Sequence, residues 1–232
     1  MNNSVIVSLR DIVVEFDGQR ILDGLNLDIH DKEFVTLLGS SGCGKTTTLR
    51  LIAGFLEPTS GKVLLKGEDI TGVPPYKRPV NTVFQKYALF PHLNVFENVA
   101  FGLRLKKMDE ETIRRKVRDM LEVVGLKGFE RRSIGQMSGG QQQRVGVARA
   151  LVVNPEIIFA DEPTGNLDSN TSREVMELMQ KVVREQKQTL VMVTHDNYLA
   201  GFADRIFHII DGKIVKIEDN RNKAEEPAAQ KA

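Results

Sequence analysis

A glycine-rich segment constrains the fold of this chain more than any other feature of its sequence. Residues 39–46, GSSGCGKT, match the phosphate-loop pattern G-x-x-x-x-G-K-[ST] in full. The segment follows an almost continuously apolar run at residues 34–38, which predicts a strand buried on both faces, and it precedes an expected helix through residues 49–53. Because a strand, a glycine loop and a helix follow one another in this order, we predict an α/β fold with a phosphate site rather than a simple linking turn.

The residue types in this loop suit the binding of a nucleotide. Glycines let backbone N–H groups approach phosphate oxygens closely, and the helix that follows adds the partial positive charge of its N-terminus. Lys45 is placed to bridge the β- and γ-phosphates, and the Thr46 hydroxyl is placed to ligate Mg²⁺. We therefore predict ATP and Mg²⁺ as cofactors. The expected ATP contacts in this segment are Gly39, Ser40, Ser41, Gly42, Cys43, Gly44, Lys45, Thr46 and Thr47.

Two adjacent carboxylates narrow the reaction. Residues 157–160, IIFA, predict a buried strand that runs directly into Asp161 and Glu162. Asp161 is placed to hold Mg²⁺, and Glu162, which points to the other side of the chain, can take a proton from water. A kinase has no need for a base aimed at water beside its Mg²⁺ ligand, because hydrolysis would compete with transfer. The pair favours an ATPase, and a soluble phosphotransferase with the same loop stays the alternative from another class.

A second helix start is also rich in small residues. Residues 138–144, SGGQQQR, open an expected helix whose apolar face includes Val145, Ala148 and Val152. An exposed helix N-terminus with a serine and two glycines is an anion site, although such a segment taken alone is also an ordinary helix cap. Because one nucleotide already fills the phosphate loop, this second site needs a γ-phosphate from elsewhere. A second copy of the chain, facing the first, can supply it.

Strands and helices alternate along the rest of the chain, which implies a parallel sheet with crossover connections. Residues 87–153 are expected to be mostly helical, because apolar residues recur there at helical spacing. Asp17-Gly18 is a turn signal between two of the first strands. The remaining expected strands are 6–9, 12–16, 25–29, 62–66, 157–160 and 190–194, with a further helix at about 172–186.

Together the three motifs resemble those of the ABC ATPases, and the match runs from about residue 9 to residue 217. The resemblance implies a P-loop NTPase fold of class α/β over residues 1–217, with a mixed, mainly parallel sheet. It also implies an N-terminal antiparallel β subdomain and an inserted α-helical subdomain at about residues 87–153. In this family the phosphate loop of one subunit and the SGGQ element of its pair sandwich ATP, so that each dimer forms two sites.

The resemblance assigns roles to single residues. Phe16 matches the aromatic residue that stacks on adenine, although tyrosine is more usual there. Gln85 matches the glutamine that contacts Mg²⁺ and the attacking water and senses the transmembrane partner. His195 matches the histidine that contacts the γ-phosphate and positions Glu162, and Asp168 lies in the loop that couples the two sites of the dimer. The expected contacts to the ATP of the paired subunit are Ser138, Gly139, Gly140 and Gln141, and the expected Mg²⁺ ligands are Thr46, Gln85 and Asp161.

Composition argues against several other classes of protein. Lys plus Arg total 32 against 31 for Asp plus Glu, which argues against a general nucleic-acid coat. The single cysteine, Cys43, excludes an intramolecular disulfide and a multi-cysteine zinc site. Residues 1–9 lack the layout of a signal peptide, and no run approaches the ~20 apolar residues of a membrane-spanning helix. If this protein serves a membrane, we expect it to act from the cytoplasmic face through a partner, and the family resemblance implies that transmembrane permease subunits hold it there.

Two parts of the chain resemble the ATPases of different transporters. From residue 9 to about residue 153 the sequence resembles the ATPase subunits of bacterial spermidine/putrescine importers, notably at residues 74–78 and 80–103. Residues 161–169, DEPTGNLDS, and 195–200, HDNYLA, are closer to the lipoprotein-release, macrolide-export and cell-division ATPases. We expect polyamine import, with a solute-binding protein as a further partner, because the importer match lies in the segment that is expected to contact the membrane partner. The export type is the alternative.

Three further expectations depend on these resemblances. Aromatic and apolar residues after Gln85 are expected either to line the groove that receives a short helix of the membrane partner or to be ordinary core. Residues 218–232 are expected to be a disordered tail, without the C-terminal regulatory domain that polyamine-type ATPases usually carry. A translation or repair factor of the same family usually has two cassettes or a long coiled coil, for which 232 residues leave no room. The groove candidates are Tyr87, Leu89, Phe90 and Phe96.

Overall fold

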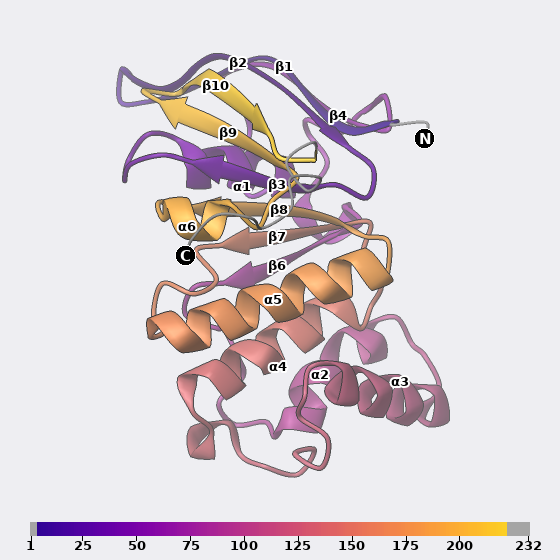
Figure 1. Cartoon of the computed structure of the whole chain (residues 1–232). Coiled ribbons are helices and arrows are strands. Elements are labelled where there is room, and N and C mark those ends of the chain that lie inside the picture. The colour runs from indigo at the N-terminus through magenta and orange to yellow at the C-terminus, as the bar shows by residue number, and fades with distance from the viewer. Residues whose placement is uncertain (1–3, 222–232) are drawn as a thin grey trace, which may run out of the picture. The chain divides into compact units, whose positions relative to one another are not determined.

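The computed structural model describes residues 4–221, which belong to two compact units (Figure 1). The first unit comprises Met1–Pro75 and Val191–Ala232, and the second comprises Tyr76–Leu190. A short 3-10 helix, η1 (Pro75–Lys77), lies where the first unit passes into the second along the chain. The chain therefore leaves the first unit once, forms the second, and returns.

The first unit contains a four-stranded sheet in the order β2-β1-β4-β5, and its β1–β2, β1–β4 and β4–β5 pairs are all antiparallel. The predicted turn at Asp17-Gly18 is confirmed, and both residues have positive φ, at 49° and 79°, as a tight hairpin turn requires. The sequence predicted two short strands where the structure has one, because the ladder shifts register near Asp11 instead of breaking. These strands are β1 (Val5–Phe16), β2 (Gln19–His30), β4 (Ser60–Leu65) and β5 (Glu68–Asp69).

The same unit contains strands in the order β10-β9-β3-β8, where β3 is parallel to β9 and β10 is antiparallel to it. All five residues of β3 are buried, as the continuous apolar run predicted. The strands are β3 (Phe34–Leu38), β8 (Thr189–Thr194, in this unit from Val191), β9 (Arg205–Ile210) and β10 (Lys213–Asp219), and the helices are α1 (Lys45–Ala53) and α6 (Asn197–Ala200).

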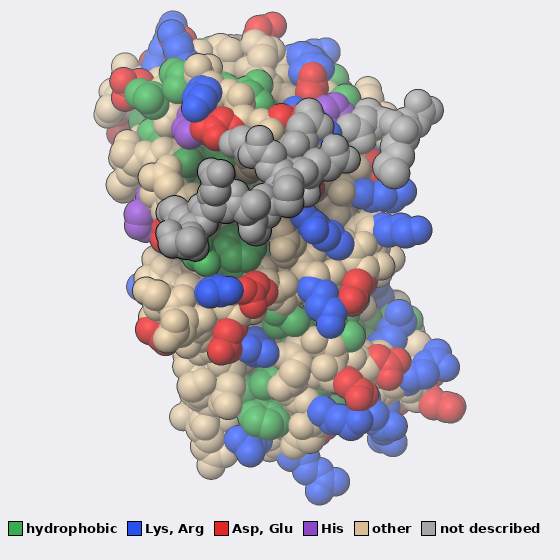
Figure 2. All heavy atoms as spheres, in the orientation of Figure 1, with side chains coloured by type: hydrophobic (Ala, Val, Ile, Leu, Met, Phe, Trp, Pro, Cys, Tyr) green, Lys and Arg blue, Asp and Glu red, His purple; other side chains and the backbone are tan. Residues whose placement is uncertain are grey.

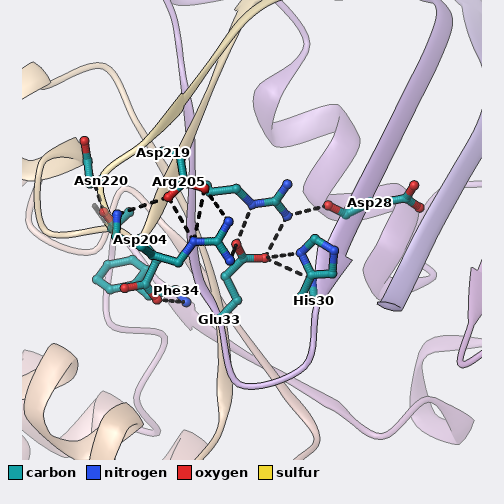
Figure 3. Close-up of polar contacts among 10 residues, drawn as sticks. Asp28, His30, Glu33, Phe34, Asp204, Arg205, Asp219 and Asn220 are labelled. Atoms are coloured by element: carbon teal, nitrogen blue, oxygen red, sulfur yellow. Dashed lines mark hydrogen bonds and ion pairs between the residues drawn. The ribbon is translucent and has the colours of Figure 1, made fainter. Parts of the chain in front are cut away.

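A buried carboxylate joins the turn after β2 to the last strands of this unit (Figure 3). Glu33 accepts hydrogen bonds from Arg205, whose Nη2 lies 2.7 Å from Glu33 Oε2 and 2.7 Å from the carbonyl oxygen of Asp28. Arg221 lies 3.9 Å from Glu33 and also pairs with Asp219, which lowers the pKa of that carboxyl to about 2. Each cation in the cluster thus has a carboxylate partner, as burial requires.

The end of the chain differs from the expected disordered tail. Glu218 and Asp219 lie in β10, and Asn220 donates through its backbone N–H to the carbonyl oxygen of Asp204 at 2.8 Å. The tail prediction is therefore wrong at its start, because polar side chains here pair with strand β9 and with buried charges. Residues 222–232, which the same prediction covers, lie outside the described residues.

The second unit is mostly helical around one parallel strand pair, in which β6 aligns with β7 from Val80 opposite Ile157 to Phe84 opposite Asp161. Helices α2, α3 and α5 each pack against α4 (Figure 1). The helical prediction for residues 87–153 holds for three helices but not for the loops between them. The elements are β6 (Val80–Phe84), α2 (Val95–Leu105), α3 (Glu110–Val123), η2 (Ile134–Gln136), α4 (Gly139–Leu151), β7 (Ile157–Asp161) and α5 (Ser169–Glu185).

The helix starts in this unit follow from polar caps in the sequence. Asn94, Asp109, Ser138 and Asp168 precede α2, α3, α4 and α5, and each side chain accepts a hydrogen bond from a backbone N–H of the first turn.

On the face in Figure 2, Lys and Arg side chains are interspersed with Asp and Glu side chains. Within residues 4–221, no helix has the length and apolar character needed to cross a membrane.

Candidate functional site

The phosphate loop connects β3 to α1 in the first unit and is shaped by two glycines. Gly44 precedes α1 with φ 103°, a conformation that favours glycine, and a Cβ on it would lie 2.6 Å from Leu22 Cδ2. A Cβ on Gly39 would lie 2.3 Å from the carbonyl oxygen of Ile209. A backbone oxygen of β9 and a side chain of β2 therefore leave no room for side chains at these two positions, which fixes the path of the loop.

Lys45 is the central charge of this loop. It is 5% exposed, and its Nζ donates to the carbonyl oxygen of Ser40 at 2.6 Å and lies 3.7 Å from Cys43 Sγ. Among the described residues no carboxylate pairs with this ammonium, and the first turn of α1 has no acidic residue. A buried cation at a helix N-terminus without a counter-charge creates a positive potential that suits a phosphate. The loop residues present therefore fit the phosphates of a nucleotide.

The two other predicted residues of the first unit lie at strand ends. Phe16 ends β1, and its side chain is 48% exposed, which leaves its ring accessible for stacking on a base. His195 follows directly after β8 and is exposed. The next residue, Asp196, caps α6 by accepting hydrogen bonds from the backbone of Tyr198 and Leu199. Phe16 at the end of one strand and His195 directly after another thus both reach the surface of the unit.

In the second unit, the ends of two parallel strands bring predicted residues together. Phe84 and Asp161 are the paired last residues of β6 and β7, so Gln85 and Glu162 directly follow the ends of neighbouring strands. The carboxyl ends of parallel strands are where open α/β sheets place ligands. Glu162 has φ 44°, an uncommon conformation for a residue with a side chain, and such strain concentrates at functional sites.

The loop after Glu162 is held by contacts to Gln85 and α4. The Asn166 Nδ2 group donates to the backbone oxygen of Gln85 at 2.9 Å, and a Cβ on Gly165 would lie 2.7 Å from the Gln85 side-chain nitrogen. Gln143, a fully buried residue of α4, donates to the carbonyl oxygen of Pro163. Three segments distant in sequence therefore meet around this loop.

The predicted contacts to a paired nucleotide form the start of α4. Ser138 Oγ accepts from the backbone N–H of Gln141 at 3.3 Å, and Gln141 Oε1 accepts from the backbone N–H of Ser138 at 3.1 Å, which is a complete capping box. Gly139 and Gly140 have close neighbours: a Cβ would lie 2.9 Å from the Tyr87 hydroxyl and 2.4 Å from Thr171 Cγ2, respectively. The helix start is thus capped and closely packed, and Ser138 remains exposed.

Asp168, the predicted coupling residue, caps the next helix. Its carboxylate accepts from the backbone N–H of Thr171 at 3.0 Å and from the Thr171 hydroxyl at 2.7 Å, and these hydrogen bonds hold the pKa of Asp168 below its usual value. Thr171 in turn contacts Gly140 through its methyl group. The side chain that fixes the start of α5 is thereby tied to the start of α4.

The histidines without a predicted role have structural contacts. His30 Nδ1 lies 3.4 Å from Glu33, His208 Nε2 lies 2.8 Å from Glu218, and the His92 ring lies 6.1 Å from that of Phe90. Residues that the sequence analysis missed are Gln143, Arg149 and Asn166, which hold the loops of the second unit. Gln143 lies four positions before the buried Val147 and therefore shares a helix face with it, a spacing that could have predicted the burial of the Gln143 side chain. No such pattern marks the other two.

A phosphate loop after a buried strand, a capped SGGQ helix start and a strand that ends at Asp161 and is followed by Glu162 define an ATP-binding cassette. The family model for the ABC transporter matches residues 22–165, and this chain belongs to that family. It is 54% identical over 196 residues to the spermidine/putrescine import ATP-binding protein PotA of Acetivibrio thermocellus, and 50% identical over 213 residues to that of Desulfitobacterium hafniense. These alignments cover 84% and 91% of the chain but 56% and 61% of the relatives, so the chain spans less than two thirds of their length.

Solved structures of the same family have the same fold. A dimeric post-hydrolysis structure of the ATP-binding cassette MJ0796, bound to ADP and Pi, superposes with a TM-score of 0.82 at 35% identity, covering 93% of this chain and 99% of that one. CbiO1 from Clostridium perfringens, part of the ABC transporter complex cbiONQ, superposes with a TM-score of 0.88 at 28% identity over 96% of this chain and 92% of that one. The predicted fold class is confirmed.

Proposed function

We propose that this chain is the ATP-binding and ATP-hydrolysing subunit of an ABC transporter and that it acts as one of a pair. The observation that carries the proposal is the buried Lys45 ammonium, which has no carboxylate partner among the described residues and lies at the start of α1. Such a charge is costly to bury unless an anion completes the site. A nucleotide phosphate is the anion that a loop of this sequence binds.

The proposed division of roles follows the predicted residues. The backbone of residues 39–47 and the Lys45 side chain hold the phosphates, and Phe16 stacks on the adenine. Glu162 takes a proton from the attacking water, a role typically worth ~10²–10⁴ in rate, and His195 positions it at the γ-phosphate. The paired subunit contributes its residues 138–141 to the same nucleotide, and Asp168 couples the two sites.

The Mg²⁺ ligands of the proposal are the Thr46 hydroxyl, the Gln85 side-chain oxygen and the Asp161 carboxylate. Oxygen donors with a single carboxylate are what Mg²⁺ takes when substrate phosphates complete its coordination. Within residues 4–221, no group of three or more His, Cys, Asp and Glu residues could hold a metal by itself, which is compatible with such a shared site. When bound, the ion would neutralise charge that develops on the phosphate oxygens.

For the cargo, we infer import of a polyamine such as spermidine or putrescine. The support comes from relatives that carry this function in their names at 46–54% identity, over most of this chain. They favour import over the lipoprotein-release or macrolide-export alternative. The proposed partners are transmembrane permease subunits, which hold the chain at the cytoplasmic face of the membrane, and a solute-binding protein that delivers the cargo.

Replacing Glu162 with Gln tests the reaction and the pairing together. The variant should bind ATP with unchanged affinity but hydrolyse it ~10²–10⁴-fold more slowly than the wild type. It should elute as a dimer in gel filtration with Mg-ATP. Only monomer under these conditions would contradict paired sites. Transfer of phosphate to an added metabolite by the wild-type chain, with none released to water, would instead support the phosphotransferase alternative.

The same variant tests the cargo in cells. Cells whose own copy carries the Glu162→Gln change should lose uptake of labelled spermidine and putrescine, while uptake of an unrelated amino acid continues. Unchanged polyamine uptake together with impaired release of a lipoprotein or macrolide would overturn the import assignment and leave the ATPase proposal intact.

A further inference from the structure

The segment that follows Gln85 has an unfavourable backbone. Tyr87 and Ala88 are consecutive residues with positive φ, at 59° and 47°. Residues with a Cβ rarely adopt this region, and two in succession persist only where the surrounding structure holds them. Local turns contribute, since the backbone N–H of Tyr87 donates to the oxygen of Phe84 at 3.1 Å. These turn hydrogen bonds use the N–H groups of the pair, so the carbonyl groups of Tyr87 and Ala88 need other partners.

Arg149 of α4 binds both of these carbonyl groups. Its Nη1 donates to the oxygen of Ala88 at 2.7 Å, and its Nη2 donates to the oxygen of Tyr87 at 3.3 Å. Its guanidinium also lies 5.7 Å from the ring centre of Phe90. Among the described residues no carboxylate pairs with Arg149, and burial lowers the pKa of its guanidinium. The planar fork of an arginine is thus used here to grip two backbone oxygens.

The segment lies along one face of α4. A Cβ on Gly146 would lie 3.6 Å from the oxygen of Tyr87, and a Cβ on Gly139 would lie 2.9 Å from the Tyr87 hydroxyl. Positions 139, 146 and 149 are separated by seven and three residues, so they share one side of the helix. Small residues at two of them let the segment approach, and the arginine at the third holds it.

The other side of the segment contacts the loop after β7. Asn166 donates to the backbone oxygen of Gln85, and Gly165 leaves room for the Gln85 side chain. The segment from Gln85 to Ala88 therefore contacts both α4, which Ser138 caps, and the loop that follows Glu162. A shift of this segment moves the Gln85 side chain relative to both.

We propose that Arg149 is a positioning residue that clamps the Tyr87–Ala88 backbone and thereby sets the place of the Gln85 side chain for hydrolysis. The proposal rests on the role of Gln85 proposed above. Arg149 acts through backbone oxygens and touches no nucleotide. Its loss should release the strained pair, let residues 85–88 relax to ordinary backbone conformations, and leave the phosphate loop as it is.

Hydrogen exchange measured by mass spectrometry tests the clamp without reference to activity. In Arg149→Met, peptides that cover residues 84–90 should exchange about tenfold faster or more, while those of α1 and α5 stay unchanged. The matched control is Arg144→Met, because Arg144 also lies on α4 and donates to a backbone oxygen, that of Val124, but does not touch the segment. In the control, exchange in residues 84–90 should equal that of the wild type.

Kinetics should separate positioning from binding. Arg149→Met should lower kcat by about 10- to 100-fold, because misplacement of about 1 Å costs that much, while the KM for ATP stays within about twofold. Arg149→Lys keeps the charge but not the planar guanidinium, so its kcat should lie between those of the wild type and Arg149→Met. Ala88→Gly introduced into Arg149→Met should restore part of kcat, because glycine adopts positive φ without strain and needs the clamp less.

Two outcomes would overturn the proposal. One is unchanged exchange in residues 84–90 of Arg149→Met, and the other is faster exchange spread evenly over residues 76–190, which would mean a merely structural role. If Arg149→Met does not fold, Arg149→Lys supports the same comparison. Absence of ATP hydrolysis in the wild-type chain would contradict the proposed function, but the exchange result would still decide whether the clamp exists.

Discussion

Lys45 shows how a single residue can favour function at the expense of stability. Its ammonium is buried against a carbonyl oxygen and a thiol, at the positive end of α1. Both the desolvation of the charge and the helix dipole disfavour this arrangement in the absence of an anion. The unliganded protein therefore holds an electrostatic cost at this position, which a bound phosphate removes.

Replacing Lys45 with Met should reveal this cost. The apolar side chain has similar volume, so the free energy of unfolding without nucleotide should stay equal or rise by up to about 2 kcal/mol. ATP at about 100 times its wild-type Kd should stabilise the wild type by about 2.7 kcal/mol and the variant hardly at all. Thermal unfolding with and without ATP measures both effects.

The control for that experiment is an exposed lysine. Lys62 is 68% exposed and pairs with Asp69 at the surface, so Lys62→Met should leave the ATP-dependent stabilisation unchanged. A Lys45→Met protein that unfolds more easily than the wild type, yet keeps its ATP-dependent stabilisation, would contradict the electrostatic account of this residue.

Residues of the candidate site differ in how far the sequence could predict them. The phosphate loop is identified by spacing alone, because each of its residue types has one physical task. Arg149 and Asn166 could not be found in this way, since their partners are backbone oxygens, which carry no sequence signal. The positive φ of Glu162 is equally invisible, because nothing in the sequence marks a non-glycine residue for that conformation.

At the scale of elements, α4 organises the second unit. Its first turn carries the capping box, its interior is buried against α2 and α5, and its last turn holds Arg149. Contacts at successive positions of the helix therefore reach three different loops. The close approach of α4 to α5 depends on Gly140, because Thr171 leaves no space for a larger residue there.

Gly140→Ala should therefore weaken the packing of these two helices. The new methyl group would lie 2.4 Å from Thr171 Cγ2, and the Thr171 hydroxyl is held by Asp168, so the free energy of unfolding should fall by about 1–3 kcal/mol. Adding Thr171→Ser removes the clashing methyl but keeps the hydroxyl, and should restore most of the loss. Urea unfolding of the single and double variants measures this, and equal stability of the two would refute the clash.

Elements with a strong local pattern were predicted best. The strand at residues 34–38 and the helix after the phosphate loop agree with the structure, because burial on both faces and a glycine cap fix their ends. The predicted break between residues 9 and 12 was wrong because pairing with β2 and β4 carries β1 through an irregular register. Asn220 and Arg221, which follow β10, looked like part of a tail because their partners, Asp204 and Glu33, are distant in sequence.

At the scale of the whole molecule, the predicted residues are divided between the two units. Lys45, Thr46 and His195 belong to the first, and Gln85, Glu162 and the start of α4 belong to the second. The proposed pairing adds a second copy that contributes its own Ser138. Activity should then depend on residues from different chains, which can be tested by mixing variants.

Ser138→Arg should bind ATP normally but hydrolyse it poorly, because the new side chain blocks the helix start that the paired nucleotide approaches. Ser138→Thr is the control, since threonine keeps the cap. Mixing Ser138→Arg with Glu162→Gln should recover ATPase activity, because one site of the mixed dimer combines an intact Glu162 with an intact Ser138. Full activity of Ser138→Arg alone, measured as phosphate release, would refute the contact between chains.

The contact between Gln85 and the Gly165–Asn166 segment also limits which residues position 165 can hold. A Cβ at position 165 would lie 2.7 Å from the Gln85 side-chain nitrogen, and both segments lie within the second unit. A larger residue at position 165 would therefore require a compensating change at position 85, so the residue types at these two positions are expected to depend on each other.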